Sequence, residues 1–143
     1  MKIINREVGY AIKALCFMLK EKEQIITTGH MATYFNISRP FLRKILQKLN
    51  QVGVVESCKG KKGGFKLSLS AEQIFLIDLI KIFQGPIQLS GCYNHGQKCP
   101  LIEDCPVRLE IERIEQKFIA DLKNISLKTI IDREKNSLVQ EKL

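Results

Sequence analysis

The stretch that most constrains the architecture of this chain is TTGHMATYFNISRPFLRKILQKLN, residues 27–50. Thr27 or Thr28 can cap a first short helix, because a hydroxyl accepts a hydrogen bond from a free N–H group at a helix start. We expect that helix to end at a tight turn, Asn36-Ile37-Ser38. Ser38 can cap a second helix, where the proline two residues later is tolerated because first-turn N–H groups have no intrahelical partner.

The second of these predicted helices has one apolar face and several cations on its remaining surface. The apolar residues follow the i, i+3, i+4, i+7 spacing of an amphipathic helix: Leu42, Ile45, Leu46 and Leu49. The cations are Arg39, Arg43, Lys44 and Lys48. Two short helices joined by a tight turn, with cations outward on the second, are typical of a helix-turn-helix.

The segment after this helix pair predicts a β-hairpin. We expect short strands at residues 54–58 and 65–69, joined by the basic and glycine-rich loop KGKKGG, residues 59–64. Glycines let the backbone turn tightly and approach closely, and lysines can contact phosphates. Lysines are also common in the exposed loops of proteins that bind no nucleic acid. The evidence for a wing is therefore the position of this hairpin directly after the helix pair. The sequence therefore predicts a wing over residues 54–69.

The charge distribution supports the same interpretation. The chain has 23 Lys and Arg against 15 Asp and Glu, for a net charge of +8. Residues 1–66 carry a net +9 and residues 67–143 a net −1. A basic front half indicates a polyanion-binding surface, although a solvated basic face is the plain alternative.

Two further helices complete the predicted fold. Ser70 and Gln73 form a capping-box pattern, which predicts a helix from there through Phe83 to a stop at Gly85-Pro86. A longer helix begins near Pro106, with a narrow apolar stripe of Val107, Ile111, Ile114, Phe118, Leu122 and Ile125. Such a stripe is a helix–helix packing seam; it could pack on its own domain, but we favour a second copy of the chain. An N-terminal helix is expected over residues 10–20, and fraying after Lys128.

These elements define a mainly α fold with a small β-hairpin (α+β), in which a winged helix-turn-helix domain precedes a long C-terminal dimerisation helix. The predicted divisions are a DNA-binding domain at 1–84, a cysteine-bearing loop at 85–105, the dimerisation helix and its return at 106–131, and a polar tail at 132–143. No apolar run reaches the ~20 residues that a membrane span requires, and the start lacks a signal peptide. We therefore expect a cytoplasmic protein without a membrane partner.

Three of the five cysteines, Cys92, Cys99 and Cys105, fall in a C-x6-C-x5-C pattern. Zinc knuckles bring cysteines in closer pairs, whereas wider gaps suit a loop around an iron–sulfur cluster held by thiolates. Unligated loop cysteines and a thiol redox switch are the alternatives. His95 lies within this segment and is more often a plain loop histidine than a ligand.

Taken in order, several motifs resemble the bacterial winged-helix regulators typified by IscR and NsrR (Rrf2 type). The similarity covers the chain from Met1 to about Ile131. It rests on Met1-Lys2-Ile3, Gly9-Tyr10-Ala11, Ile37-Ser38-Arg39-Pro40-Phe41-Leu42, Lys59-Gly60, Gly63-Gly64-Phe65, Ile77-Asp78-Leu79-Ile80, Gly85-Pro86-Ile87 and the three cysteines.

The resemblance implies a homodimer paired through the long helix, a palindromic operator, and an iron–sulfur cluster that tunes DNA affinity, [2Fe-2S] in preference to [4Fe-4S]. Two features depart from the pattern of that family. The first cysteine gap is one residue longer than the commoner spacing, and Arg108 stands where some members have a histidine ligand. Other members take a carboxylate from the partner's N-terminal region, and Glu7 lies beside the matching position, so Glu7 is a candidate fourth ligand.

The predicted function is a dimeric, cluster-sensing transcriptional repressor that binds double-stranded DNA. Arg43 is expected to read guanine and the lysines to hold phosphates. The candidate DNA-binding residues are Thr28, Ser38, Arg39, Pro40, Arg43, Lys44, Lys48, Lys59, Lys61 and Lys62. The alternatives are the same regulator sensing through thiols or a protein partner and, more distantly, an iron–sulfur carrier. No catalytic constellation or small-molecule substrate is indicated, so we expect no enzyme activity.

Overall fold

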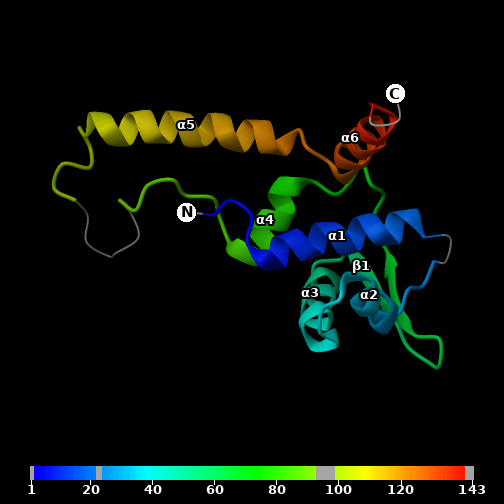
Figure 1. Cartoon of the computed structure of the whole chain (residues 1–143). Helices are drawn as coiled ribbons and strands as arrows, with labels where there is room; N and C mark the ends of the chain where they lie inside the picture. Colours follow the sequence, from blue (N-terminus) through cyan, green and yellow to red (C-terminus); the bar gives the residue numbers. More distant parts are fainter. Residues whose placement is uncertain (1, 22–23, 93–98, 141–143) are drawn as a thin grey trace.

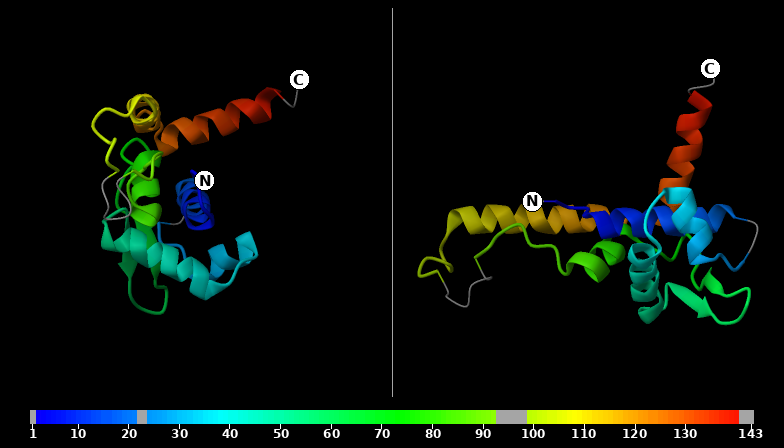
Figure 2. Two further views of the ribbon diagram at one scale, coloured as in Figure 1. Left: turned by 90° about the vertical axis from the view of Figure 1, so that its left-hand side faces the viewer. Right: turned by 60° about the horizontal axis from the view of Figure 1, so that its bottom comes forward.

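The structure is a computed structural model that describes residues 2–21, 24–92 and 99–140 (Figure 1). α1 to α4 and the hairpin pack together, α5 extends away from them, and α6 starts near α1 and projects from it at a steep angle (Figures 1 and 2). The described elements are α1 (Arg6–Lys20), α2 (Thr28–Phe35), α3 (Arg39–Gln51), β1 (Val55–Cys58), β2 (Gly64–Leu67), α4 (Leu76–Gln84), α5 (Pro106–Lys123) and α6 (Leu127–Gln140). The mainly α fold with a small hairpin is confirmed.

α1 begins four residues earlier than the sequence predicts. Its N-cap is Asn5, whose Oδ1 accepts a hydrogen bond from the N–H of Val8 at 2.8 Å. The prediction of a start at Tyr10 followed the apolar periodicity alone and overlooked this cap. The buried face of α1 consists of Val8, Ala11, Ala14, Leu15, Phe17 and Met18.

The helix-turn-helix forms as its caps predict. The Thr27 hydroxyl accepts from the N–H of His30 at 3.1 Å, and α2 ends at Asn36 in the left-handed conformation with φ 52°. The Ser38 hydroxyl accepts from the N–H of Phe41 at 3.4 Å and caps α3. The predicted apolar face of α3 is fully buried: Leu42, Ile45, Leu46 and Leu49.

The hairpin is attached to the chain that precedes α2. β1 and β2 pair antiparallel, and Phe65 forms a two-bond bridge with Ile26, with both N···O distances at 2.9 Å. Gly64 is required at this bridge, because a Cβ there would overlap the Ile26 carbonyl and lie 3.0 Å from Thr27 Cα. The strands are slightly offset from the predicted residues 54–58 and 65–69.

The capping box does not start a helix as predicted. Gln73 Oε1 accepts from the N–H of Ser70 at 3.0 Å, but α4 begins only at Leu76. Residues 71–73 form a turn, and Phe75 is extended because the chain there pairs with the α5–α6 junction. The Leu127 N–H donates to the Ile74 carbonyl, and the Leu76 N–H donates to the Ile125 carbonyl, both at 2.9 Å.

The C-terminal region is more ordered than the sequence suggests. The predicted fraying after Lys128 is wrong, because α6 is helical from Leu127 to Gln140. Its start is stabilised by the Ser126 hydroxyl, which accepts from the N–H of Thr129 at 3.2 Å. Leu127 is fully buried, and Glu134 pairs with Lys20 of α1 at 2.7 Å. None of the helices in the described part of the chain has the length and apolar character to span a membrane.

Candidate DNA interface and cysteine segment

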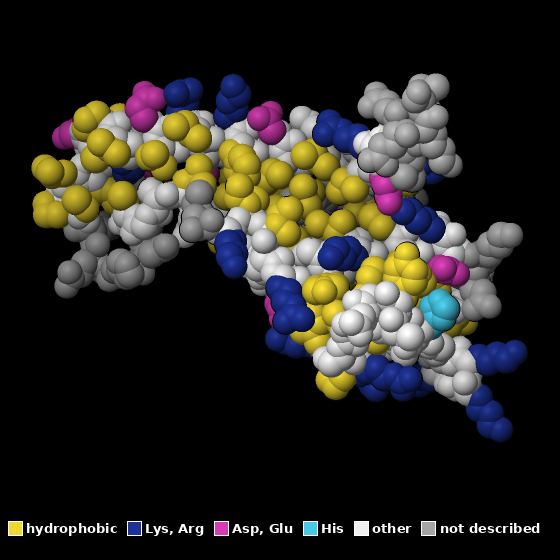
Figure 3. Space-filling model, in the orientation of Figure 1, with side chains coloured by type: hydrophobic (Ala, Val, Ile, Leu, Met, Phe, Trp, Pro, Cys, Tyr) yellow, Lys and Arg dark blue, Asp and Glu magenta, His cyan; other side chains and the backbone are white. Residues whose placement is uncertain are grey.

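An open hollow of about 540 Å³ separates α3 from the hairpin. Thr28, Arg43, Lys59 and Lys61 line it, so the structure brings together four of the predicted DNA-binding residues from three parts of the chain. Arg43 is exposed and, among the described residues, takes part in no hydrogen bond or ion pair. Figure 3 shows cations gathered along this edge of the molecule and extending from the hairpin. The arrangement leaves Arg43 free to meet an anionic ligand.

Two polar residues of the hollow were not predicted from the sequence. Gln47 follows Arg43 by one helical turn on the same face of α3 and also lines the hollow. Asn50 lies one turn further, and its Oδ1 accepts from the N–H of Ser57 at 3.2 Å, which ties α3 to β1. The signal that could have identified Gln47 is its i+4 spacing from Arg43.

The other predicted cations of α3 have different surroundings. The guanidinium of Arg39 lies against Gly29, where an added Cβ would be 2.9 Å from a guanidinium nitrogen. Lys48 Nζ lies 5.1 Å from the centroid of the Phe83 ring. Lys44 Nζ forms an ion pair with Glu7 Oε1 at 2.9 Å. Thus α3 presents Arg43 towards the hairpin and holds Lys44 and Lys48 against α1 and α4.

The remaining predicted residues lie at the cap of α3 and at the hairpin tip. Ser38 uses its hydroxyl to cap α3, and Pro40 is exposed in the first turn. Lys62 is exposed at the tip, where the Gly63 N–H donates to the Gly60 carbonyl at 3.0 Å. A Cβ at Gly63 would lie 2.6 Å from the Cys58 carbonyl oxygen, so the tip closes this tightly only with glycine.

The cysteine segment leads into α5. Cys92 and Cys105 are half-buried, Cys99 is exposed, and all three are free thiols. Cys105 directly precedes α5 and accepts from the N–H of Leu109 at 3.2 Å through its carbonyl. Three thiols from one segment are a donor set suited to an iron–sulfur cluster. Within the described residues, however, no three His, Cys, Asp or Glu side chains converge on one point.

The other ligand candidates are accounted for as follows. His95 lies outside the described residues. Glu7 carries a carboxylate that already pairs with Lys44 of the same chain, so ligation would require that pair to break. Arg108 forms an ion pair with Glu112 at 2.6 Å and donates to the Glu103 carbonyl at 3.4 Å. Arg108 therefore braces the first turns of α5.

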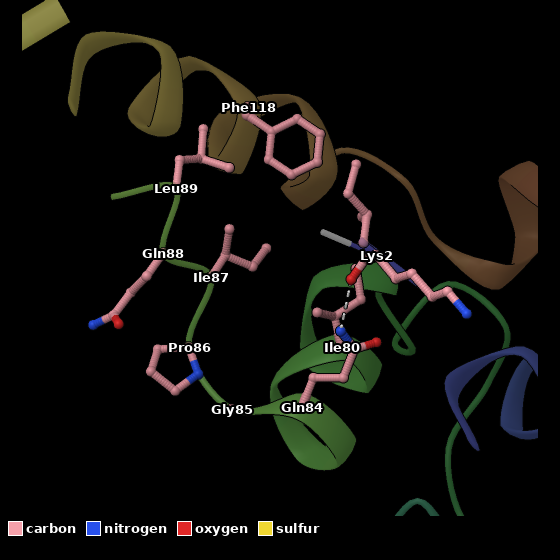
Figure 4. Close-up of a pocket in the computed structure, with 10 residues that line it drawn as sticks. Lys2, Ile80, Gln84, Gly85, Pro86, Ile87, Gln88, Leu89 and Phe118 are labelled. Carbon is pink, nitrogen blue, oxygen red and sulfur yellow. Dashed lines mark hydrogen bonds between the residues drawn. The ribbon is translucent and has the colours of Figure 1, made fainter. Parts of the chain in front are cut away.

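The connection between the cysteines and the DNA-binding half lines a small hollow of about 120 Å³ (Figure 4). The Gln84 amide at the end of α4 donates to the Lys2 carbonyl at 3.2 Å and accepts from the Asn5 N–H at 2.8 Å. Leu89 donates its N–H to Glu115 of α5 at 2.6 Å. The chain that leads to Cys92 is thus fastened both to α5 and, through α4, to the cap of α1.

Cys16 lies apart from both regions and packs against the core, as its place in an apolar helix predicts. Burial raises the pKa of the Cys16 thiol, and nearby Lys20 partly offsets that effect. The hydrogen bond to Glu134 raises the pKa of Lys20. Cys16 therefore stays protonated at neutral pH and is a packing residue.

A helix-turn-helix followed by a hairpin, with a cation-lined hollow between them, defines a winged-helix DNA-binding protein. The family model described as Rrf2, iron-dependent transcriptional regulator, matches residues 4–133. The chain belongs to this family of transcriptional regulators.

Individual relatives agree with this assignment. The HTH-type transcriptional regulator NsrR of Halalkalibacterium halodurans is 26% identical over 127 residues, which cover 87% of each chain. Among solved structures, IscR of T. potens superimposes with a TM-score of 0.72 at 17% identity, covering 96% of this chain and 90% of the other. CymR (YrzC), the global cysteine regulator of B. subtilis, superimposes with a TM-score of 0.69 at 21% identity, covering 93% of this chain and 98% of the other. At these identities the two structural likenesses show the fold alone.

Proposed function

We propose that this chain is a homodimeric transcriptional repressor that binds a palindromic operator on double-stranded DNA. In this proposal an iron–sulfur cluster held by Cys92, Cys99 and Cys105 modulates its affinity. The observation that carries the DNA-binding part is the hollow between α3 and the hairpin, which unites predicted contacts from separate elements. Membership in a family of transcriptional regulators favours this reading over an iron–sulfur carrier. The expected location is the cytoplasm, with no membrane partner and no small-molecule substrate.

The chemistry of the interface divides into base contacts and phosphate contacts. The major groove admits an α-helix, and an exposed arginine in the second turn of α3 can donate two hydrogen bonds to guanine. Gln47, one turn later, has the amide that pairs with adenine. Lys59, Lys61 and Lys62 are point charges on the hairpin and suit phosphate oxygens, which hold the protein in register without reading sequence.

The proposed dimer uses the N-terminal part of the apolar stripe on α5. Val107 and Ile114 leave 68% and 45% of their surface exposed, whereas Phe118 and Leu122 of the same stripe pack on the chain's own core. Figure 3 shows apolar side chains continuing along this helix. Contiguous apolar surface of this kind on a soluble chain marks an interface, and the helical seam matches a second copy of the same helix. A dimer would also supply the two recognition helices that a palindrome requires.

The three cysteines would hold the cluster, [2Fe-2S] in preference to [4Fe-4S], with Glu7 as the candidate for the remaining position and His95 less favoured. When bound, such a cluster supplies chemistry sensitive to redox state and nitric oxide. The protein's own contribution is the linkage from Leu89 to α5 and from Gln84 to the cap of α1. These hydrogen bonds join the cysteine segment to the helix that packs behind α3.

The second candidate is the same regulator without a cluster, sensing through cysteine thiols or a protein partner. The exposed thiol of Cys99 supports this candidate, since accessible thiolates are the ones that oxidise.

The deciding experiment is purification without oxygen, followed by visible absorption spectroscopy and iron and sulfide analysis. Cys99→Ala is the test variant, and Cys16→Ala, which alters a packing cysteine, is the control. We expect colour, iron and sulfide in the wild type and the control, and their loss in Cys99→Ala. A colourless dimer that selects a duplex from a randomised library would support the thiol-sensing candidate. A protein that binds no duplex would overturn both.

A further inference from the structure

Glu7 is placed to act on the recognition helix from outside it. The helix α3 contains no Asp or Glu, so its cations have no acidic partner on their own element. Glu7, in the first turn of α1, supplies one by pairing with Lys44 at 2.9 Å. The neighbouring cation Arg6 does not compete for this carboxylate, because its guanidinium lies 4.7 Å from the Phe41 ring centroid. The contact therefore joins one acid and one lysine across two helices.

The two partners differ in exposure and in the length of their side chains. The Glu7 side chain is 26% exposed and the Lys44 side chain 71% exposed. Glu7 projects from a turn fixed by the Asn5 cap, and the Asn5 N–H is itself bound to Gln84 at 2.8 Å. Lys44 reaches the carboxylate through a flexible four-carbon stem. The acid is therefore the more buried partner, and the lysine is the one that reaches across to it.

We infer that Glu7 is an affinity-setting residue, which holds Lys44 away from the DNA backbone and weakens operator binding. This inference rests on the proposed DNA-binding function. Lys44 must leave Glu7 before it can contact a phosphate. The free energy of breaking the ion pair with Glu7 therefore offsets part of the free energy gained from the phosphate contact. The carboxylate also stays beside the binding face and repels phosphates. Lys44, predicted to hold a phosphate, thus contributes less than an unpaired lysine would.

The test compares Glu7→Gln with the wild type on one duplex selected from a randomised library. Binding is measured by fluorescence anisotropy over a salt series, with chelator-treated, metal-free protein. The substitution keeps the side-chain size and removes the charge. We expect affinity to rise about two- to fivefold per subunit. The slope of the logarithm of the association constant against the logarithm of the salt concentration should become steeper by about 0.9 per subunit, because Lys44 gains a phosphate contact.

The matched control is Glu134→Gln, which breaks the exposed Lys20–Glu134 pair and changes net charge equally. A rise in DNA affinity that is confined to Glu7→Gln supports the inference. An equal rise in affinity in both variants, or no rise in Glu7→Gln, overturns it. The double variant with Lys44→Gln provides a second readout, since the gain from Glu7→Gln should disappear without the lysine. If Glu7→Gln does not fold, Glu7→Asp withdraws the carboxylate and is expected to raise affinity by a smaller factor. Failure of the wild type itself to bind any duplex would instead overturn the proposed function.

Discussion

The backbone bridge that attaches the hairpin to the chain before α2 predicts that the substitution Gly64→Ala destabilises the protein. The new Cβ would overlap the Ile26 carbonyl, so the two hydrogen bonds between Ile26 and Phe65 cannot both keep their 2.9 Å length. Each backbone hydrogen bond contributes about 0.5–1.5 kcal/mol, so losing both costs about 1–3 kcal/mol. Phe65 is buried beside the bridge, and its partial exposure adds to that cost.

Thermal unfolding at one fixed protein concentration is the direct assay, because the proposed dimerisation would make the midpoint concentration-dependent. For a chain of this size the expected loss lowers the midpoint by about 3–10 °C. Gly91→Ala is the control, since no atom lies within 4 Å of its added Cβ. DNA binding should weaken for all duplexes alike, because the hairpin lysines lose their position relative to α3. If Gly64→Ala unfolds at the same temperature as the control, the bridge does not stabilise the hairpin.

Three further predictions concern the DNA-binding cations, the turn at Asn36 and the cysteines. Arg43→Ala should weaken the binding free energy by about 1–3 kcal/mol on a selected operator and by less on a random duplex. Lys61→Ala should weaken binding to both duplexes equally and reduce the salt dependence of binding, and titrations at several salt concentrations measure both effects. Asn36→Val should destabilise the fold by about 1–2 kcal/mol in urea unfolding, because a β-branched residue is strained at a φ of 52°, and Asn36→Gly should not. Because burial raises the pKa of Cys16, its alkylation at about pH 8 should lag behind that of the exposed Cys99 and accelerate as the pH rises further, which mass spectrometry can follow.

The part of the fold that sequence reasoning predicted correctly is the part governed by local rules. Thr27 and Ser38 cap α2 and α3 because a hydroxyl at a helix start has one favourable role. The apolar residues of α3 are buried because their spacing leaves one apolar face: Leu42, Ile45, Leu46 and Leu49. The hairpin followed from the same local logic, since glycines and lysines separate two short apolar runs.

Apart from the start of α1, where the local Asn5 cap was overlooked, the errors arose where contacts between distant residues decide the outcome. The extended conformation at Phe75 depends on a backbone bridge to Ser126, more than fifty positions away, and the local capping box gives no sign of it. α6 is helical although its residues are polar, in part because Leu127 is buried in the core of the first half. The ion pair of Lys44 with Glu7 likewise depends on how α1 crosses α3.

The backbone pairing of residues 74–76 with residues 125–127 has a consequence for operator geometry. It fastens the junction of α5 and α6 to the start of α4 through two hydrogen bonds, both at 2.9 Å. In the proposed dimer the two recognition helices would then keep a fixed separation, because these hydrogen bonds hold the end of the pairing helix against the DNA-binding half. One base pair inserted between half-sites turns the second half-site by roughly 35° around the duplex axis. A protein without a joint at this position cannot follow that rotation, so its operators should tolerate substitutions between the half-sites far better than insertions or deletions.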